Sequence, residues 1–117
     1  ALSGKDITVY GTGEQKRDLM YVDDTVDAFL IMGSNEKAIG EAVNFGTGKD
    51  TKIIDLAKKI IDISGSNSKI IHLPPRPSEV IRLCCDNSKA RKLFNWEPRI
   101  SIEEGLRKNI DYARQRI

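Results

Sequence analysis

The part of the sequence that decides the fold is Val9-Tyr10-Gly11-Thr12-Gly13-Glu14-Gln15-Lys16-Arg17-Asp18-Leu19-Met20-Tyr21-Val22-Asp23-Asp24. Its pattern predicts a β-branched strand, a turn with two glycines, a second extended piece and then the start of a helix. Because Gly11 and Gly13 tolerate positive φ or close backbone approach, the turn can return Arg17 to the side of the first strand. An arginine held there can bind a phosphate.

A plain surface hairpin explains the same residues, with Arg17 either paired to Asp18 or solvated. The glycines also match no familiar phosphate motif. Position 16 is a lysine rather than the third glycine of a dinucleotide fingerprint, and no Gly-Lys-Ser or Gly-Lys-Thr sequence makes a P-loop. The residues of this stretch alone leave both interpretations open.

Composition limits the protein class. The 117 residues fit a single domain, and 39% hydrophobic with 31% charged residues is typical of a globular chain. The net charge of +2 is too small for bulk nucleic-acid binding, so an anion site has to be local. No apolar run is long enough for a membrane span. We expect a cytoplasmic protein with no membrane and no nucleic-acid partner.

The cysteines and the histidine predict no metal site. Cys84 and Cys85 are adjacent, which rules out a disulfide framework, and we expect both to be buried strand thiols. His72 lies in an apolar run, where a packed or rim histidine is commoner than a metal ligand.

The rest of the chain alternates short strands and helices. Periodicity and capping residues predict strands over 7–10, 42–45, 69–73 and 80–84, and helices over about 24–32, 52–64, 86–94 and 101–113. This order predicts an α/β fold (α+β by local order), in which a small mixed sheet of short strands and four helices form one core.

A second arginine lies in a loop stiffened by proline. Pro75 and Pro77 flank Arg76, and Ser78 and Glu79 complete the turn. Such a loop suits anion capture, because less conformational entropy is lost when the ligand binds.

Several motifs resemble those of the NAD-dependent sugar-nucleotide epimerases and dehydratases, the extended short-chain dehydrogenases that include UDP-glucose 4-epimerase. The opening stretch is similar to the family's strand, Gly-x-Gly and Arg-Asp segment. Further similar motifs are Val43-Asn44-Phe45-Gly46-Thr47-Gly48, Pro75-Arg76-Pro77-Ser78-Glu79, Asp86-x-Ser88-Lys89-Ala90, Leu93-Phe94-Asn95-Trp96-x-Pro98 and Ser101-x-x-Glu104-Gly105-Leu106. The family's Gly-x-x-Gly-x-x-Gly opening and its Tyr-x-x-x-Lys pair are missing. The chain therefore resembles only the C-terminal, substrate-binding portion.

The resemblance implies a role for six residues in binding a nucleoside diphosphate sugar. Arg17 and Arg76 would clamp the diphosphate, the strand at Val9 and Tyr10 would lie along the base, and Glu79 would orient the loop. Arg82 is a third candidate cation, which can instead pair with a carboxylate. The parent enzyme would be an isomerase or a lyase that uses NAD(P). No catalytic, cofactor-binding or metal-binding residue is assigned to this chain.

The implied partners are a Rossmann NAD-binding domain, absent from residues 1–117, and a second copy of the chain. We expect an exposed apolar face for them near Val43 and Phe45. Three departures from the family pattern matter: Leu19 for an aromatic residue, Lys52 for a helix-capping residue and Ser78 for glycine. Two other functions stay open, a stand-alone sugar-nucleotide module without catalysis and a generic anion- or RNA-binding domain.

Overall fold

The computed structural model describes residues 1–116. The elements follow in the order β1 (Ile7–Tyr10), β2 (Lys16–Asp18), α1 (Val22–Ser34), the 3-10 helix η1 (Glu36–Ala38), β3 (Asp50–Lys52), α2 (Ile53–Ser64), β4 (Ile70–Leu73), β5 (Arg82–Leu83), α3 (Ser88–Phe94) and α4 (Ile102–Arg114). The α/β class and the four α-helices are confirmed for these residues. None of the described helices has the length and apolar character needed to cross a membrane.

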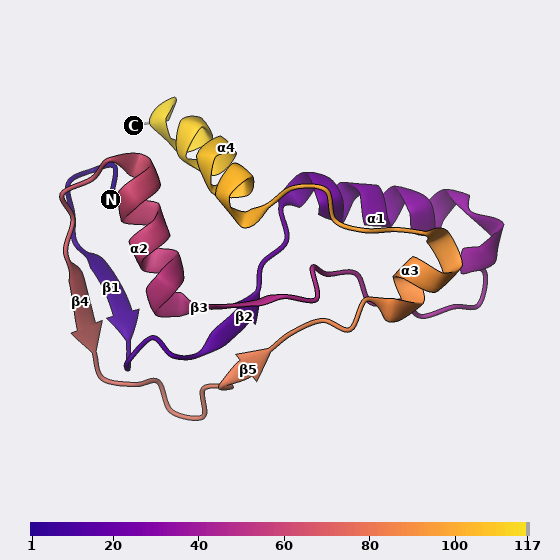
Figure 1. Cartoon of the computed structure of the whole chain (residues 1–117), viewed down its shortest axis with the longest axis horizontal. Helices are drawn as coiled ribbons and strands as arrows, with labels where there is room; N and C mark the ends of the chain where they lie inside the picture. Colours follow the sequence, from indigo (N-terminus) through magenta and orange to yellow (C-terminus); the bar gives the residue numbers. More distant parts are fainter. Residues whose placement is uncertain (117) are drawn as a thin grey trace.

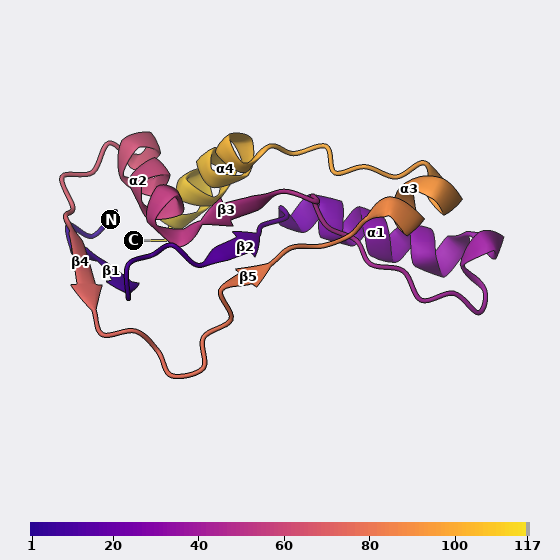
Figure 2. The ribbon, with the colours of Figure 1, turned by 60° about the horizontal axis from the view of Figure 1, so that its bottom comes forward.

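The strands form two small sheets instead of the single expected one. β1 pairs in parallel with β4, and β2 lies between antiparallel β3 and parallel β5. In Figure 1 the β1–β4 sheet lies with α2 and α4 at one end of the molecule, α1 and α3 lie at the other end, and the three-stranded sheet runs between them. The turned view of Figure 2 shows the same order along the chain's long axis.

Helices α2 and α4 each have one apolar face, and these faces pack against each other. The Ser101 hydroxyl accepts a 3.1 Å hydrogen bond from the Glu104 amide, which confirms the expected N-terminal cap of α4. Gly65 ends α2 in the left-handed region, with φ of 64°. Lys52 makes no side-chain cap at the start of α2 and instead forms a 2.7 Å ion pair with Glu14.

The other end of the molecule has its own small core. Ala28 of α1, Ala90 of α3 and Trp96 are buried together. The edge of the Trp96 ring system meets Phe45 at a centroid distance of 5.0 Å. Both Phe45 and Val43 pack against this cluster, so the exposed apolar face that we expected there is absent from that position.

Two predicted strands are corrected. Residues 42–45 pair with no strand among the described residues, because Val43 and Phe45 are held by side-chain packing. The predicted strand over 80–84 shrinks to Arg82–Leu83. Cys84 and Cys85 therefore follow a strand, and both are only partly buried. The sequence analysis missed β3, because its residues Asp-Thr-Lys carry no apolar alternation.

Buried Asp24 ties the start of α1 to a segment far along the chain. Its side chain is only 2% exposed, and its two carboxylate oxygens accept hydrogen bonds of 3.0 Å from the amides of Arg99 and Ile100. The carboxylate thereby satisfies two backbone donors in the connection between α3 and α4.

Replacing Asp24 with Ala should destabilise the fold more than the same change at its neighbour. Asp24→Ala leaves both amides without an acceptor, and we expect the free energy of unfolding to fall by about 3 kcal/mol. Asp23, whose side chain is 64% exposed and which lies 3.8 Å from Lys108, provides the matched control. We expect a loss of no more than about 0.5 kcal/mol for Asp23→Ala. Urea denaturation followed by circular dichroism measures both, and equal losses would contradict the role of Asp24.

Candidate functional site

Arg17 projects from β2 onto the loop that follows β4. Its Nη1 donates 2.8 Å hydrogen bonds to the carbonyls of Lys16 and Val80, and its Nη2 lies 3.5 Å from the Glu79 carboxylate. About a quarter of the Arg17 side chain is exposed. The fold therefore brings Arg17 to the loop that carries the second predicted arginine, where it contacts Glu79 and Val80.

Gln15 links β1 to the same loop. Its amide nitrogen donates a 3.1 Å hydrogen bond to the Tyr10 carbonyl and lies 3.5 Å from both oxygens of Glu79. Gln15 therefore orients Glu79 from one side while Arg17 holds it from the other. Sequence reasoning did not assign Gln15 to the site, although the residue lies in the stretch that decides the fold.

Arg76 stacks on the ring of Tyr10, which was also expected at the site. Its guanidinium carbon lies 4.0 Å from the centroid of the Tyr10 ring, within the range of a cation–π interaction. Arg76 is exposed, so its remaining donors can reach a ligand. Ser78 adopts φ of 58°, which shows that the loop uses a left-handed residue where the resembled family has glycine.

Val9 is placed beside Tyr10 but differs from it in role. Its side chain is 2% exposed and faces the α2 side, because a Cβ at Gly13 would meet both Val9 and Ile54. Only the main chain of Val9 is left for a ligand. In the described residues β1 has a strand partner on one edge, β4, and its other edge has none.

Arg82 lies away from the other arginines of the site. It pairs in register with Lys16 of β2, so the alternation of the strand places it on the face opposite Arg17. Its guanidinium donates to Asp50 of β3, and this hydrogen bond lowers the pKa of the Asp50 carboxyl. The structure thus joins Arg17, Arg76, Tyr10 and Glu79 around one loop and leaves Arg82 outside.

Asp18, the residue after Arg17, fixes the position of β2 relative to two distant segments. Its carboxylate accepts hydrogen bonds from the amides of Thr47 (3.1 Å), Gly48 (2.9 Å) and Cys85 (3.2 Å), and from the Thr47 hydroxyl. Burial raises the pKa of the adjacent Cys85 thiol. Asp18 is therefore a structural anchor, and it explains why an acidic residue follows the arginine.

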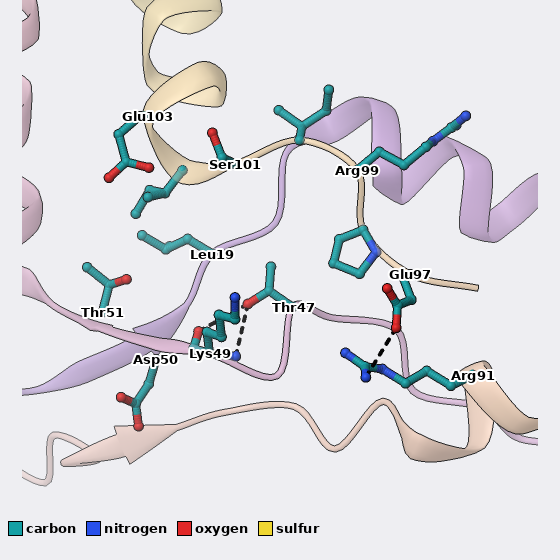
Figure 3. A pocket seen from close by; sticks show the side chains of 13 residues that line it. Leu19, Thr47, Lys49, Asp50, Thr51, Arg91, Glu97, Arg99, Ser101 and Glu103 are labelled. Carbon is teal, nitrogen blue, oxygen red and sulfur yellow. Dashed lines mark hydrogen bonds and ion pairs between the residues drawn. The ribbon is translucent and has the colours of Figure 1, made fainter. Parts of the chain in front are cut away.

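A separate hollow lies away from these arginines. A pocket of about 520 Å³ is lined by the turn after Phe45, by β3 and by the segment that leads into α4 (Figure 3). Its charged side chains are largely neutralised within the chain: Arg91 pairs with Glu97 at 3.2 Å, Arg99 with Asp27, and Glu103 with Lys59. This pocket consequently lacks the excess positive charge that a diphosphate requires.

The glycine turn after β1 does not form a cradle for a dinucleotide. A Cβ at Gly13 would lie 2.9 Å from the Val9 side chain, and a Cβ at Gly11 would lie 3.4 Å from Pro75. Packing against Val9 and Ile54 therefore accounts for the glycine at position 13 without a bound ligand.

Comparison of the sequence with known protein families identifies the family. A model of the GDP-mannose 4,6 dehydratase family matches residues 1–109. The chain belongs to this family. Its relatives are sugar-nucleotide epimerases, dehydratases and decarboxylases, and the resemblance to extended short-chain dehydrogenases is confirmed.

Individual relatives show how much of a family member this chain covers. It is 37% identical to UDP-glucuronic acid decarboxylase 1 of Xenopus tropicalis over all of its own length and 27% of the relative. It is 32% identical to UDP-glucose 4-epimerase of Mycolicibacterium smegmatis, covering 98% of this chain and 36% of the relative.

A solved structure supports the same conclusion about the fold. UDP-glucuronic acid 4-epimerase of Bacillus cereus, in complex with UDP-glucuronic acid and NAD, superposes with a TM-score of 0.90 at 32% identity. The match covers 99% of this chain and 37% of that one. The chain thus spans about a quarter to two fifths of the length of these proteins.

Close packing of Gly46 against Asp18 and Cys85 leads to a testable stability effect. A Cβ at Gly46 would lie 2.8 Å from the Cys85 Sγ and 3.0 Å from an Asp18 oxygen, so Gly46→Ala should lower the free energy of unfolding by about 1–3 kcal/mol. Gly33 has open space around it within α1, and Gly33→Ala should stabilise the helix by about 0.5–1 kcal/mol. Opposite signs in urea denaturation are expected, and a neutral Gly46→Ala would refute the packing argument.

Proposed function

We propose that this chain is the substrate-binding portion of an NAD-dependent sugar-nucleotide epimerase or dehydratase, and that it binds a nucleoside diphosphate sugar without catalysing a reaction alone. The observation that supports the proposal is that Arg17 contacts Glu79 and Val80 of the same loop that carries Arg76, while Arg76 stacks on Tyr10. A diphosphate is a concentrated negative charge, and two guanidinium groups match it with several paired donors.

The rest of the ligand has suitable neighbours in the same place. The base would lie along β1, where the main chain of Val9 and Tyr10 is at a sheet edge and the Tyr10 ring offers an apolar surface. Glu79 would leave Arg17 when the phosphates arrive and stay oriented by Gln15. Its departure frees the guanidinium for the stronger bidentate contact with phosphate.

The reaction itself needs groups that we do not find in this chain. NAD supplies oxidation and re-reduction of the sugar, and a Tyr-x-x-x-Lys pair would supply the proton transfer. Tyr21 is followed four positions later by Thr25, and Tyr112 by Arg116. Arg116 instead stacks on Tyr112 at 4.1 Å. Whether the enzyme is an isomerase or a lyase would therefore be decided outside these residues.

The stand-alone binding module uses the same residues, and it differs from the enzyme portion only in having no catalytic partner. An RNA-binding function is less well supported. RNA-binding domains stack bases on exposed aromatic rings, whereas the single Trp96 is 4% exposed and lies in the core.

Removing either arginine should weaken ligand binding. We expect Arg17→Ala and Arg76→Ala each to cost about 1.5–3 kcal/mol of UDP-glucose binding free energy, the range for hydrogen bonds to a charged group. The two losses should be non-additive, since a diphosphate released by one arginine can move away from the other. The measurement is calorimetry on a chimera, in which this chain replaces the matching segment of the Mycolicibacterium smegmatis epimerase.

Arg91→Ala is the matched control, because Arg91 is paired with Glu97 and lies outside the site. It should leave the affinity unchanged. Arg17→Ala should also lower the stability by about 1 kcal/mol, since Arg17 bonds the Val80 carbonyl, while Arg76→Ala should not. Unchanged affinity in both site variants, or strictly additive losses, would make the arginines structural only.

The unmodified chain should not bind NAD. Its glycine turn has Lys16 in place of the third glycine of a dinucleotide fingerprint, and packing against Val9 and Ile54 accounts for Gly13. Isothermal titration with NAD should give no saturable heat, whereas UDP-glucose should give a weak signal that Arg76→Ala removes. Saturable NAD binding by the chain would overturn its assignment as the substrate-binding portion alone.

A further inference from the structure

His72 forms a hydrogen bond that no sequence pattern indicated. Its Nδ1 lies 2.7 Å from the main-chain carbonyl oxygen of Gly11, and the residue is exposed. A carbonyl oxygen only accepts hydrogen bonds, so the His72 Nδ1 carries a proton and is the donor. The neutral ring is thereby held as the tautomer whose Nε2 is an acceptor.

Gly11 is the corner between β1 and the glycine turn, and β4 holds both of its main-chain polar groups. Its amide donates a 2.8 Å hydrogen bond to the Leu73 carbonyl, while its carbonyl accepts the bond from His72. Its φ of 64° lies in the left-handed region, which glycine adopts without strain. Two adjacent residues of β4 therefore fix the orientation of this corner.

This corner connects the two side chains that stack at the candidate site. Tyr10 directly precedes Gly11, and Arg76 directly follows Pro75, whose Cβ would lie 3.4 Å from a Cβ built on Gly11. The Arg76 guanidinium carbon lies 4.0 Å from the centroid of the Tyr10 ring. A rotation of Gly11 would consequently move the Tyr10 ring on one side and the arginine loop on the other.

His72 itself faces away from the stacked pair. It lies in register with Val9, whereas Leu73 lies in register with Tyr10. Because side chains alternate along a strand, His72 and Tyr10 belong to opposite faces of the β1–β4 sheet. His72 is therefore placed to act on the stack through the main chain of Gly11 and not through a contact with the same ligand.

We propose that His72 is a positioning residue for the sugar-nucleotide site: by holding the Gly11 carbonyl, it keeps the Tyr10 ring in place against Arg76. This inference rests on the proposed function. The contribution of the bond to stability is small, because the bond is exposed and water can satisfy the carbonyl when the imidazole is removed. Water does not fix the orientation of the corner, which is the part that the site needs.

The first test uses the chain without a ligand, where the signal is unambiguous because His72 is the single histidine. NMR of the ring nitrogens should find the proton of the neutral ring on Nδ1, whereas an unrestrained neutral histidine carries it mainly on Nε2. The side-chain protons of Arg76 should be shifted upfield by the Tyr10 ring. A neutral ring protonated on Nε2, or Arg76 protons without that shift, would overturn the proposal.

Two replacements of similar shape separate the donor from the bulk of the side chain. Asn has its amide nitrogen where His72 has Nδ1, and Leu has a methyl group there. We expect His72→Leu to remove the upfield shift of Arg76 and to weaken UDP-glucose binding by the chimera about three- to tenfold, the range for one neutral hydrogen bond. His72→Asn should preserve both the shift and the affinity. Each replacement should change Tm by less than about 3 °C.

Asp6→Ala is the matched control. Asp6 accepts an exposed 2.8 Å hydrogen bond from the Lys69 amide, so it links the same two segments at the far end of the β1–β4 sheet. Its removal should change neither the Arg76 resonances nor the affinity for UDP-glucose. The same losses in Asp6→Ala as in His72→Leu would show a general effect of the strand pair and contradict a role specific to His72.

A double variant tests whether His72 acts through Arg76. In the Arg76→Ala background, His72→Leu should cause no further loss of affinity, because the arginine that it positions is then absent. An equal loss in that background would mean that His72 contacts the ligand itself, and a loss shared by His72→Asn would mean that the hydrogen bond is irrelevant. Either result refutes the positioning role.

Failure of this proposal can be told apart from failure of the proposed function. If Arg76→Ala lowers the affinity and His72→Leu does not, the proposed function stands and the positioning role is wrong. If Arg76→Ala keeps the full affinity, the proposed function is wrong and a role of His72 in that site falls with it. The NMR comparison of His72→Leu with His72→Asn then still decides whether His72 fixes the stack of Tyr10 and Arg76.

Discussion

The Asp18 carboxylate is the contact on which the arrangement of the middle of the molecule depends. It receives the amides of Thr47, Gly48 and Cys85, so the end of β2, the turn before β3 and the residues after β5 meet at one side chain. The strands themselves are only two or three residues long and contribute few ladder hydrogen bonds. A charged acceptor that receives several hydrogen bonds stabilises the contact between these segments, which the short strands alone do not. Arg17, as its neighbour, is placed by the same contact.

The candidate site is organised by the chain before any ligand is bound. Arg17 is held by Glu79 and by the Val80 carbonyl, and Arg76 is held by the Tyr10 ring. This order would reduce the conformational entropy lost on binding, and a phosphate that bound Arg17 as proposed would have to replace the Glu79 carboxylate. The left-handed Ser78 stores some backbone strain in the same loop. The loop thus helps to position the arginines, and its Glu79 carboxylate would compete with a phosphate for Arg17.

The exposed apolar side chains of α1 and the thin shape of the molecule have one physical explanation. A single layer of helices and short strands buries few large side chains, and four of the seven buried apolar residues that the structure describes are alanines. Such a layer gains its stability from a second layer that covers it. This chain spans only 27–37% of the length of the relatives described above, which is consistent with that interpretation.

The sequence alone determined the helices α2 and α4, the first strand and the family, because these depend on local periodicity, capping residues and motif order. It also pointed to the loop around Arg76. Tertiary structure decided the rest. Whether residues 42–45 pair as a strand depends on a distant partner strand. In this structure Val43 and Phe45 instead pack against the cluster that contains Trp96. The sequence left open whether Arg82 joins the other arginines or pairs with a carboxylate, and the register of β5 on β2 places it on the face opposite Arg17. The exposure of Val26, Phe29 and Leu30 on α1 is likewise decided by tertiary packing and is recorded in no local pattern.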